Sequence, residues 1–293
     1  MRAQVGDVEL EYELHGPDDG VPVVLIAGIF QQLTFWNEVL LRELTDAGMR
    51  VLIFDNRDVG LSTIEAREPP DPVAVVAGDL SGVNYTLSDM ARDTAGLIDE
   101  VGFGSAHVLG HSMGGMIAQR LVIEHPERVR SLVLMSTSPM DMVTGQPASV
   151  FTALFLRPGT ADPAEAYARI VEAYRLCERP DPVDEARLEA FAKRQEDRAP
   201  NPDMQCMQAS FATTHEGMRS SPTHLEQLAM ISQPTLVIHG IGDLLVCEDG
   251  GERLAELIPG AELLLIDAMG HIPQAPERWD AIADEVISHI EAS

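Results

Sequence analysis

The motif Gly110-His111-Ser112-Met113-Gly114 constrains the fold of this 293-residue chain more than any other stretch. A serine at the apex of a very tight turn between a strand and a helix leaves no room for a Cβ atom on either side, and the two glycines of G-x-S-x-G remove that clash. The apolar residues 106–109 predict the strand, and residues 115–125 have apolar positions at helical spacing. The motif therefore predicts a strand-to-helix turn with Ser112 as a candidate nucleophile.

Two further residues follow in the order that a serine nucleophile allows, first an acid and then a histidine. Asp243 stands just past an apolar run that includes Val237 and Ile238. His271 follows the next such run, residues 262–266, and precedes the last predicted helix. Because both positions come after predicted strands, both side chains are expected at the carboxyl edge of the sheet together with Ser112. Asp243 is the favoured acid and His271 the favoured base.

Other residues compete for these roles. His111 adjoins the serine but is expected to point away from it across so sharp a turn, so it is interpreted as a packing residue or as one that supports the catalytic residues from behind. His239, at the end of a predicted strand, is interpreted as a buried histidine rather than a base. Asp141 is the first carboxylate after the apolar run 133–138 and is the runner-up acid.

With these residues in this order, the sequence resembles the α/β-hydrolases along nearly its whole length, except for a central insertion. The loop 55–62 resembles their D-x-R-G-x-G-x-S loop, with Asp58 where many members have glycine, and this variant is similar to bacterial polyketide methylesterases such as aclacinomycin methylesterase. Asp55 and Arg57 are interpreted as a structural network that holds the loop. The resemblance implies an α/β-hydrolase fold, a mostly parallel sheet flanked by helices, with an inserted helical cap.

The residues expected to form an oxyanion hole depart from the common family pattern. The usual His-Gly after the third strand is replaced by Ala27-Gly28-Ile29-Phe30. Because two backbone N–H groups stabilise the oxyanion, the turn that directs them matters more than the side chains. Met113, at the start of the predicted helix, is the expected first donor, since unpaired amides and the helix dipole favour negative charge there. Ile29 is the expected second donor, with Phe30 as its alternative.

The pattern of strands and helices divides the chain into two parts. Strands alternate with helices in residues 1–138 and 230–293, which predicts the α/β-hydrolase core. In residues 139–229 three helix-like blocks follow without a strand, which predicts the cap. Met204 and Met207 lie on one apolar stripe of the third block. Core packing is the first interpretation of this stripe, and a pocket lining together with Phe30 is the second.

Composition narrows the class of partner. A net charge of −27 repels nucleic acid and anionic membranes, so the expected partner is a small-molecule ester, with the chain a monomer or homodimer. No apolar run approaches membrane-spanning length and no secretory signal is recognised, which favours a cytoplasmic location. The three cysteines form no C-x-x-C pair. Neither a metal nor a cofactor is expected.

These residues together favour a serine hydrolase that cleaves esters of a small or medium apolar compound, methyl esters included. A serine nucleophile excludes the dehalogenase and epoxide hydrolase chemistry of related folds, which needs a carboxylate at that position. The same triad also serves lactonase, amidase, carbon–carbon hydrolase and perhydrolase reactions, so the ester is a choice within that class. A slow or non-catalytic small-molecule receptor on the same scaffold stays open as an alternative.

Overall fold

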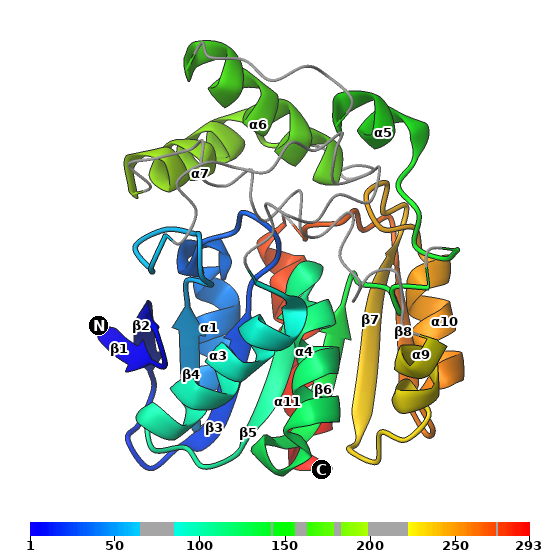
Figure 1. Ribbon diagram of the computed structural model, residues 1–293. Helices are drawn as coiled ribbons and strands as arrows, with labels where there is room; N and C mark the ends of the chain where they lie inside the picture. Colours follow the sequence, from blue (N-terminus) through cyan, green and yellow to red (C-terminus); the bar gives the residue numbers. More distant parts are fainter. Residues whose placement is uncertain (65–84, 142, 156–162, 179–182, 199–221, 274) are drawn as a thin grey trace.

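The centre of the molecule is an eight-stranded sheet with the strand order β1-β2-β4-β3-β5-β6-β7-β8 (Figure 1). The computed structural model describes residues 1–64, 85–141, 143–155, 163–178, 183–198, 222–273 and 275–293. The strands are β1 (Arg2–Val5), β2 (Val8–His15), β3 (Val21–Ile26), β4 (Met49–Phe54), β5 (Ala106–His111), β6 (Val129–Met135), β7 (Thr235–Ile241) and β8 (Glu262–Asp267).

The sheet is mostly parallel, as the sequence predicts. Strands β3 to β8 pair in parallel, whereas β1 and β2 form an antiparallel hairpin and β2 pairs antiparallel with β4, with Tyr12 opposite Phe54. Parallel strands that are covered on both faces are apolar along their whole length. Accordingly, every residue of β5 is buried. The carboxyl ends of these strands meet at one edge, where the candidate site lies.

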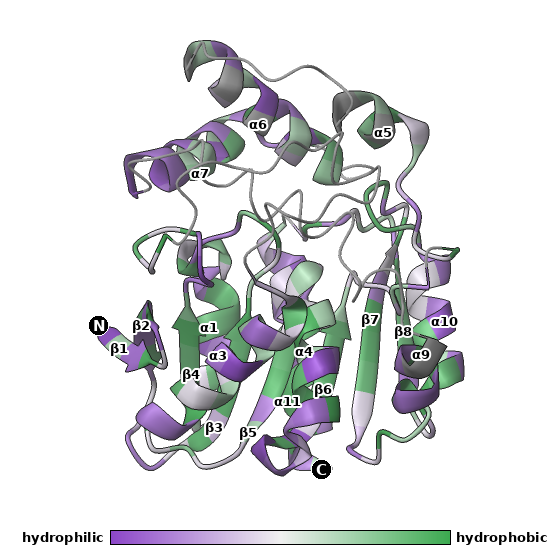
Figure 2. Ribbon diagram, in the orientation of Figure 1, coloured by the Kyte–Doolittle hydropathy of each residue, from purple (hydrophilic) through white to green (hydrophobic). Residues whose placement is uncertain are grey.

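Helices cover both faces of the sheet. Alternate residues of β3 show the two layers, since Val24 and Ile26 belong to the apolar cluster under α3 (Leu87–Glu100) and α4 (Met113–Glu124). Val23 and Leu25 belong to the cluster under α1 (Glu38–Asp46) and α11 (Pro276–Glu291). Figure 2 shows the strands as mostly apolar and polar residues on the outward faces of α3 and α4. Complete burial of each such aliphatic side chain stabilises the fold by about 1.5–3 kcal/mol.

Helix α3 begins with a reciprocal pair of hydrogen bonds between a side chain and the backbone. The Thr86 hydroxyl accepts a hydrogen bond from the Asp89 N–H at 3.1 Å, and the Asp89 carboxylate accepts one from the Thr86 N–H at 2.7 Å. This reciprocal capping box satisfies two N–H groups that the first turn of the helix would leave unpaired. The helix therefore starts at a fixed residue and packs beside α4.

The segment between β6 and β7 contains helices α5 (Ser149–Phe155), α6 (Pro163–Cys177), α7 (Glu185–Arg198) and α9 (Pro222–Leu228), and no strand among its described residues. Helices α5, α6 and α7, the cap helices, lie over the carboxyl edge of the sheet in Figure 1. Helix α9 packs against α4 instead. The predicted block with Met204 and Met207 lies outside the described residues. None of the helices described combines the length and apolar composition needed to cross a bilayer.

Candidate active site

Ser112 occupies a strained turn between β5 and α4. Its φ of 56° and ψ of −123° lie where only glycine is comfortable, and such strain costs about 1–3 kcal/mol. Two hydrogen bonds, to the last residue of β6 and to a residue just after it, hold this conformation. The Ser112 N–H donates to the Met135 carbonyl at 2.9 Å, and its carbonyl accepts from the Thr137 hydroxyl at 2.8 Å. The turn therefore holds Ser112 at the carboxyl end of β5.

The glycines around this turn are required by close backbone contacts. A Cβ atom at Gly110 would overlap the carbonyl oxygen of Gly114, and one at Gly114 would overlap the carbonyl oxygen of Ile26. A Cβ atom at Gly28 would lie 3.0 Å from the Ser112 Cβ atom. The steric reason for the G-x-S-x-G pattern is thus present at both glycines, and the chain after β3 passes directly beside Ser112.

Asp243 and His271 form a buried pair. Asp243 follows β7 and His271 follows β8, and the Asp243 Oδ2 atom lies 2.7 Å from the His271 Nδ1 atom. The other carboxylate oxygen accepts from the N–H groups of Leu245 and Val246 at 2.8 and 2.9 Å. Burial alone raises the pKa of Asp243, but the charge of His271 and hydrogen bonds from His239 and His271 outweigh it and lower the pKa below its usual range. The carboxylate is therefore ionised at neutral pH.

His111 connects the turn at Ser112 to the loop of His271. Its Nε2 atom lies 2.9 Å from the His271 carbonyl oxygen, and the two imidazole centroids are 4.9 Å apart. Among the described residues, however, no hydrogen bond joins the Ser112 hydroxyl to His271. The structure thus brings Asp243 and His271 into contact and places Ser112 next to a residue that touches His271.

The ring of His111 is wholly buried and stacks on Phe35, with 4.7 Å between centroids. Its Nδ1 atom lies 3.0 Å from the Gln31 Oε1 atom. Burial and the charge of His271 lower the pKa of His111 to about 3, so the ring is neutral at pH 7. A neutral ring carries one N–H and donates to only one of its two acceptors. His111 is therefore a packing residue, as its sequence position predicts, with polar contacts to two loops.

The competing residues have other contacts. His239 is buried, with its Nε2 atom 2.8 Å from the Val246 carbonyl oxygen and 3.5 Å from Asp243 Oδ2, and its Nδ1 atom has no hydrogen-bond partner among the described residues. It therefore contacts Asp243 from a second side, which strand position alone does not indicate. The Asp141 carboxylate accepts from the N–H groups of Val143 and Thr144 in its own loop. The pairing with His271 favours Asp243 as the acid.

The loop of residues 27–32, the β3 loop, supplies the candidate second oxyanion donor. Met113 is the first residue of α4, so its N–H has no partner within the helix. In the β3 loop, the Gln31 N–H donates to the Gly28 carbonyl at 3.2 Å, and the Gly28 N–H donates to Gln31 Oε1 at 2.7 Å. The Gly28 amide is thus used within the loop. Ile29 and Phe30 remain the candidate donors, and Phe30, which is half-buried, has a φ of 61°.

Asp55 and Arg57 both have structural roles, but in two separate groups. The Arg57 guanidinium makes two hydrogen bonds to the buried Asp93 carboxylate, at 2.6 and 2.7 Å, and lies 5.0 Å from the Tyr85 ring centroid. Asp55 instead pairs with Arg198 of helix α7 at 2.5 Å. The network predicted from the loop therefore reaches the cap through Asp55. No group of three or more potential metal ligands occurs in the part of the chain that the structure describes.

Several known proteins are similar to this chain in sequence. “Putative carbamate hydrolase RutD” of Azorhizobium caulinodans is 30% identical over 275 residues, 92% of this chain and 90% of that protein. The protein of the same name from Variovorax paradoxus is 37% identical over 127 residues, 43% of this chain and 42% of that one. Rhodomycin D methylesterase DauP of Streptomyces sp. strain C5 is 26% identical over 98% of this chain and 96% of that protein.

A solved structure shows the same fold. The 2-hydroxy-6-oxo-6-phenylhexa-2,4-dienoate hydrolase of Rhodococcus sp. strain RHA1 superposes with a TM-score of 0.77 at 23% identity, over 99% of this chain and 97% of that one. The family model described as alpha/beta hydrolase fold matches residues 21–277. With its eight-stranded, mostly parallel sheet between two layers of helices, this chain belongs to the α/β-hydrolase family.

Proposed function

We propose that this hydrolase cleaves carboxylic esters through an acyl-enzyme on Ser112. The observation that carries the proposal is the buried pair of an ionised Asp243 and His271, 2.7 Å apart, at the same sheet edge as the strained Ser112 turn. An aspartate bound to Nδ1–H fixes the imidazole tautomer and leaves Nε2 as the base. The missing Ser112–His271 hydrogen bond is compatible with this role, because such bonds often form only in the substrate complex.

The reaction proceeds in two halves with these residues. The Ser112 Oγ atom attacks the ester carbonyl carbon while His271 Nε2 takes the hydroxyl proton. The tetrahedral intermediate then expels the alcohol, which receives that proton from His271. Water enters, gives a proton to His271 and attacks the acyl carbon, and the serine leaves with its proton restored. The charge on Asp243 stabilises the imidazolium that forms in each half.

The oxyanion of each tetrahedral intermediate would accept hydrogen bonds from the Met113 N–H and from the Ile29 or Phe30 N–H. The closeness of Gly28 to Ser112 supports the second donor, because a Cβ atom at Gly28 would lie only 3.0 Å from the Ser112 Cβ atom, so the β3 loop passes beside the nucleophile. Loss of one such donor typically costs about 3–4 kcal/mol in the transition state.

The relatives suggest two classes of ester-like substrate. The methylesterase DauP supports a methyl ester of an apolar acid, and the net charge of −27 disfavours polyanionic substrates. The 30% identity with a protein named as a carbamate hydrolase makes carbamate cleavage the second candidate. Both reactions begin with attack on a carbonyl carbon, so the residues above do not distinguish them.

The test is steady-state hydrolysis of p-nitrophenyl esters from acetate to octanoate. Methyl esters of the acyl groups that are turned over, and carbamates of the same alcohols, are then compared. Ser112→Ala should abolish turnover, and Ser232→Ala, an exposed serine, should retain it. A fluorophosphonate should add its mass to Ser112 in the wild type. A well-folded wild type that neither turns over an ester nor takes the label would reject the esterase and favour the receptor alternative.

A further inference from the structure

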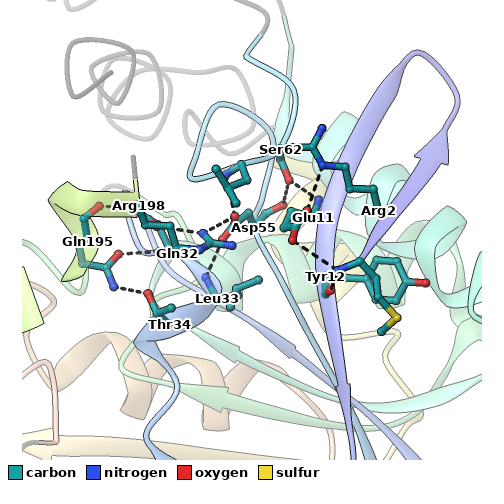
Figure 3. A network of polar contacts seen from close by, with 12 residues as sticks. Arg2, Glu11, Tyr12, Gln32, Leu33, Thr34, Asp55, Ser62, Gln195 and Arg198 are labelled. Carbon is teal, nitrogen blue, oxygen red and sulfur yellow. Dashed lines mark hydrogen bonds and ion pairs between the residues drawn. The ribbon is translucent and has the colours of Figure 1, made fainter. Parts of the chain in front are cut away.

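The last turn of cap helix α7 is hydrogen-bonded to the end of the β3 loop and to Thr34 just after it. Figure 3 shows Gln195 directed towards Gln32 and Thr34. The Gln195 side-chain amide donates to the Thr34 hydroxyl at 2.6 Å, and its backbone carbonyl accepts from the Gln32 side-chain amide at 2.8 Å. The Gln195 Oε1 atom also accepts from the Gln32 backbone N–H at 3.4 Å. One cap residue thus makes three hydrogen bonds with two residues of the core domain, Gln32 and Thr34.

Arg198, one helical turn further along, makes the second half of this connection. Its Nη1 atom donates to Gln32 Oε1 at 2.9 Å and to Asp55 Oδ2 at 2.5 Å (Figure 3). Asp55 is fully buried and also accepts from the backbone N–H groups of Leu33 and Leu61 at 2.8 and 2.9 Å. A buried carboxylate needs a cationic partner, because desolvation otherwise disfavours its charge. The cap therefore supplies the charge partner of a core residue.

These bonds hold the backbone directly after the strained residue of the β3 loop. Phe30 has a φ of 61°, and a non-glycine residue keeps such a conformation only where its surroundings fix it. Gln31 is bonded to Gly28 on one side and lies against His111 on the other. The next two backbone N–H groups, of Gln32 and Leu33, are bound by Gln195 and by Asp55. Helix α7 thus provides the first of these two acceptors itself, and through Arg198 it provides the charge partner of the second.

We propose that Gln195 and Arg198 are positioning residues, through which the seated cap holds the β3 loop in the shape that directs an Ile29 or Phe30 N–H towards Ser112. The proposal rests on the esterase function proposed above. It couples the cap to the transition state as well as to substrate binding. If instead these residues only anchored the cap, their loss would weaken binding of substrates that reach the cap and would leave chemistry on a very small substrate unchanged.

The experiment compares Gln195→Leu, Arg198→Met and Arg198→Lys with the wild type on p-nitrophenyl acetate, which has the smallest acyl group of the series. Lys193→Met is the matched control, because Lys193 lies on the same helix and its ion pair with Asp197 is exposed. For Gln195→Leu and Arg198→Met we expect kcat to fall about tenfold to a hundredfold with KM changed less than about threefold, as for partial loss of an oxyanion donor. Arg198→Lys should recover part of kcat, and Lys193→Met should stay within about twofold.

A second measurement does not depend on turnover. Amide hydrogen exchange of residues 28–35 should be faster in Gln195→Leu and in Arg198→Met than in the wild type, while exchange in β5 and β6 should be unchanged. If Arg198→Met does not fold, Gln195→Leu and Thr34→Val test the same connection from its two sides, because they remove the two partners of one hydrogen bond.

The outcomes separate the two proposals. A wild type without ester turnover rejects the proposed function, and the exchange data then show whether α7 restrains the β3 loop. If the wild type is active, and Gln195→Leu and Arg198→Met raise KM without changing kcat, these residues only hold the cap in place. The positioning role is overturned if Gln195→Leu and Arg198→Met have the same kcat as Lys193→Met. It is also overturned if amide exchange of residues 28–35 is unchanged in these two variants.

Discussion

The Nε2 atom of His111 lies 2.9 Å from the carbonyl oxygen of His271, so the residue before the candidate nucleophile is bonded to the backbone of the candidate base. The cap holds the same loop from another side, because the Ile272 N–H donates to the Cys177 carbonyl at the end of α6, 3.1 Å away. The loop of His271 is thus fixed between the Ser112 turn and the cap. Its geometry depends on both.

The first prediction concerns the acid. Asp243→Asn replaces a carboxylate that accepts the His271 Nδ1–H with an amide that can present N–H there, which favours the wrong imidazole tautomer. We expect kcat to fall by about 10⁴-fold with little change in KM. Steady-state kinetics on a p-nitrophenyl ester measure this. Asp141→Asn is the control and should stay within about threefold, whereas the reverse pattern would assign the acid to Asp141.

The turn at Ser112 could be predicted from five residues because its cause is local. Backbone atoms of the chain itself exclude a Cβ atom at Gly110 and Gly114, and that constraint is visible in the motif. The meeting of Asp243 and His271 could be predicted from a topological rule, because residues after parallel strands gather at one edge.

The contacts of Asp55 and His239 could not be predicted in the same way. Asp55 pairs with Arg198, 143 residues away, and the position of a cap helix over the core depends on packing that sequence spacing does not encode. The approach of His239 to Asp243 depends on how the chain turns after β7. Such long-range side-chain pairs follow from tertiary structure, so the sequence predicted a structural network at Asp55 but not its connection to the cap.

The second prediction compares two helical glycines. Alanine at Gly114 would place its Cβ atom against the Ile26 carbonyl oxygen, which is backbone of the central strand β3 and cannot move cheaply. Alanine at Gly96 in α3 would also overlap a neighbour, but that neighbour is a side-chain methyl group of Val5 rather than backbone, and alanine favours a helix over glycine by about 1 kcal/mol. We expect Gly114→Ala to lower the free energy of unfolding by about 3 kcal/mol and Gly96→Ala to lower it by less than half of that. Chemical denaturation measures both, and equal losses would contradict the steric account of the turn.

The third prediction concerns the buried pair of Arg57 and Asp93. Burial raises the pKa of Asp93, while the hydrogen bonds and charge of Arg57 act to lower it. Arg57→Met leaves the carboxylate without its guanidinium partner, which typically costs about 3–5 kcal/mol of unfolding free energy. The double variant Arg57→Met, Asp93→Leu removes both charges and should be more stable than Arg57→Met. Urea titration of the wild type, the single variants Arg57→Met and Asp93→Leu, and the double variant gives the coupling free energy, and strict additivity would show that the pair does not interact.

The last prediction is a pH dependence of stability that originates at His111. Burial and the charge of His271 lower its pKa to about 3 in the folded protein, whereas an unfolded histidine has a pKa near 6.5. Between these values the unfolded chain binds a proton that the folded protein excludes. The stabilisation is therefore complete above about pH 6.5 and is lost as the pH falls towards about 3, by up to about 1.4 kcal/mol per pH unit.

His111→Asn removes this group, so the unfolding free energy of the variant should fall less steeply than that of the wild type between about pH 6 and pH 4. Other buried groups do not confuse the comparison. Burial lowers the pKa of both His107 and His224 to about 4 and raises that of Glu178 to about 7, but all three are common to both proteins and cancel in the difference. Denaturant titrations across this range measure the two slopes, and above about pH 7.5 the two curves should run parallel. Equal slopes between about pH 6 and pH 4 would mean that folded His111 takes up its proton as readily as the unfolded chain does, so that its contacts with Gln31 and the His271 carbonyl outweigh its burial.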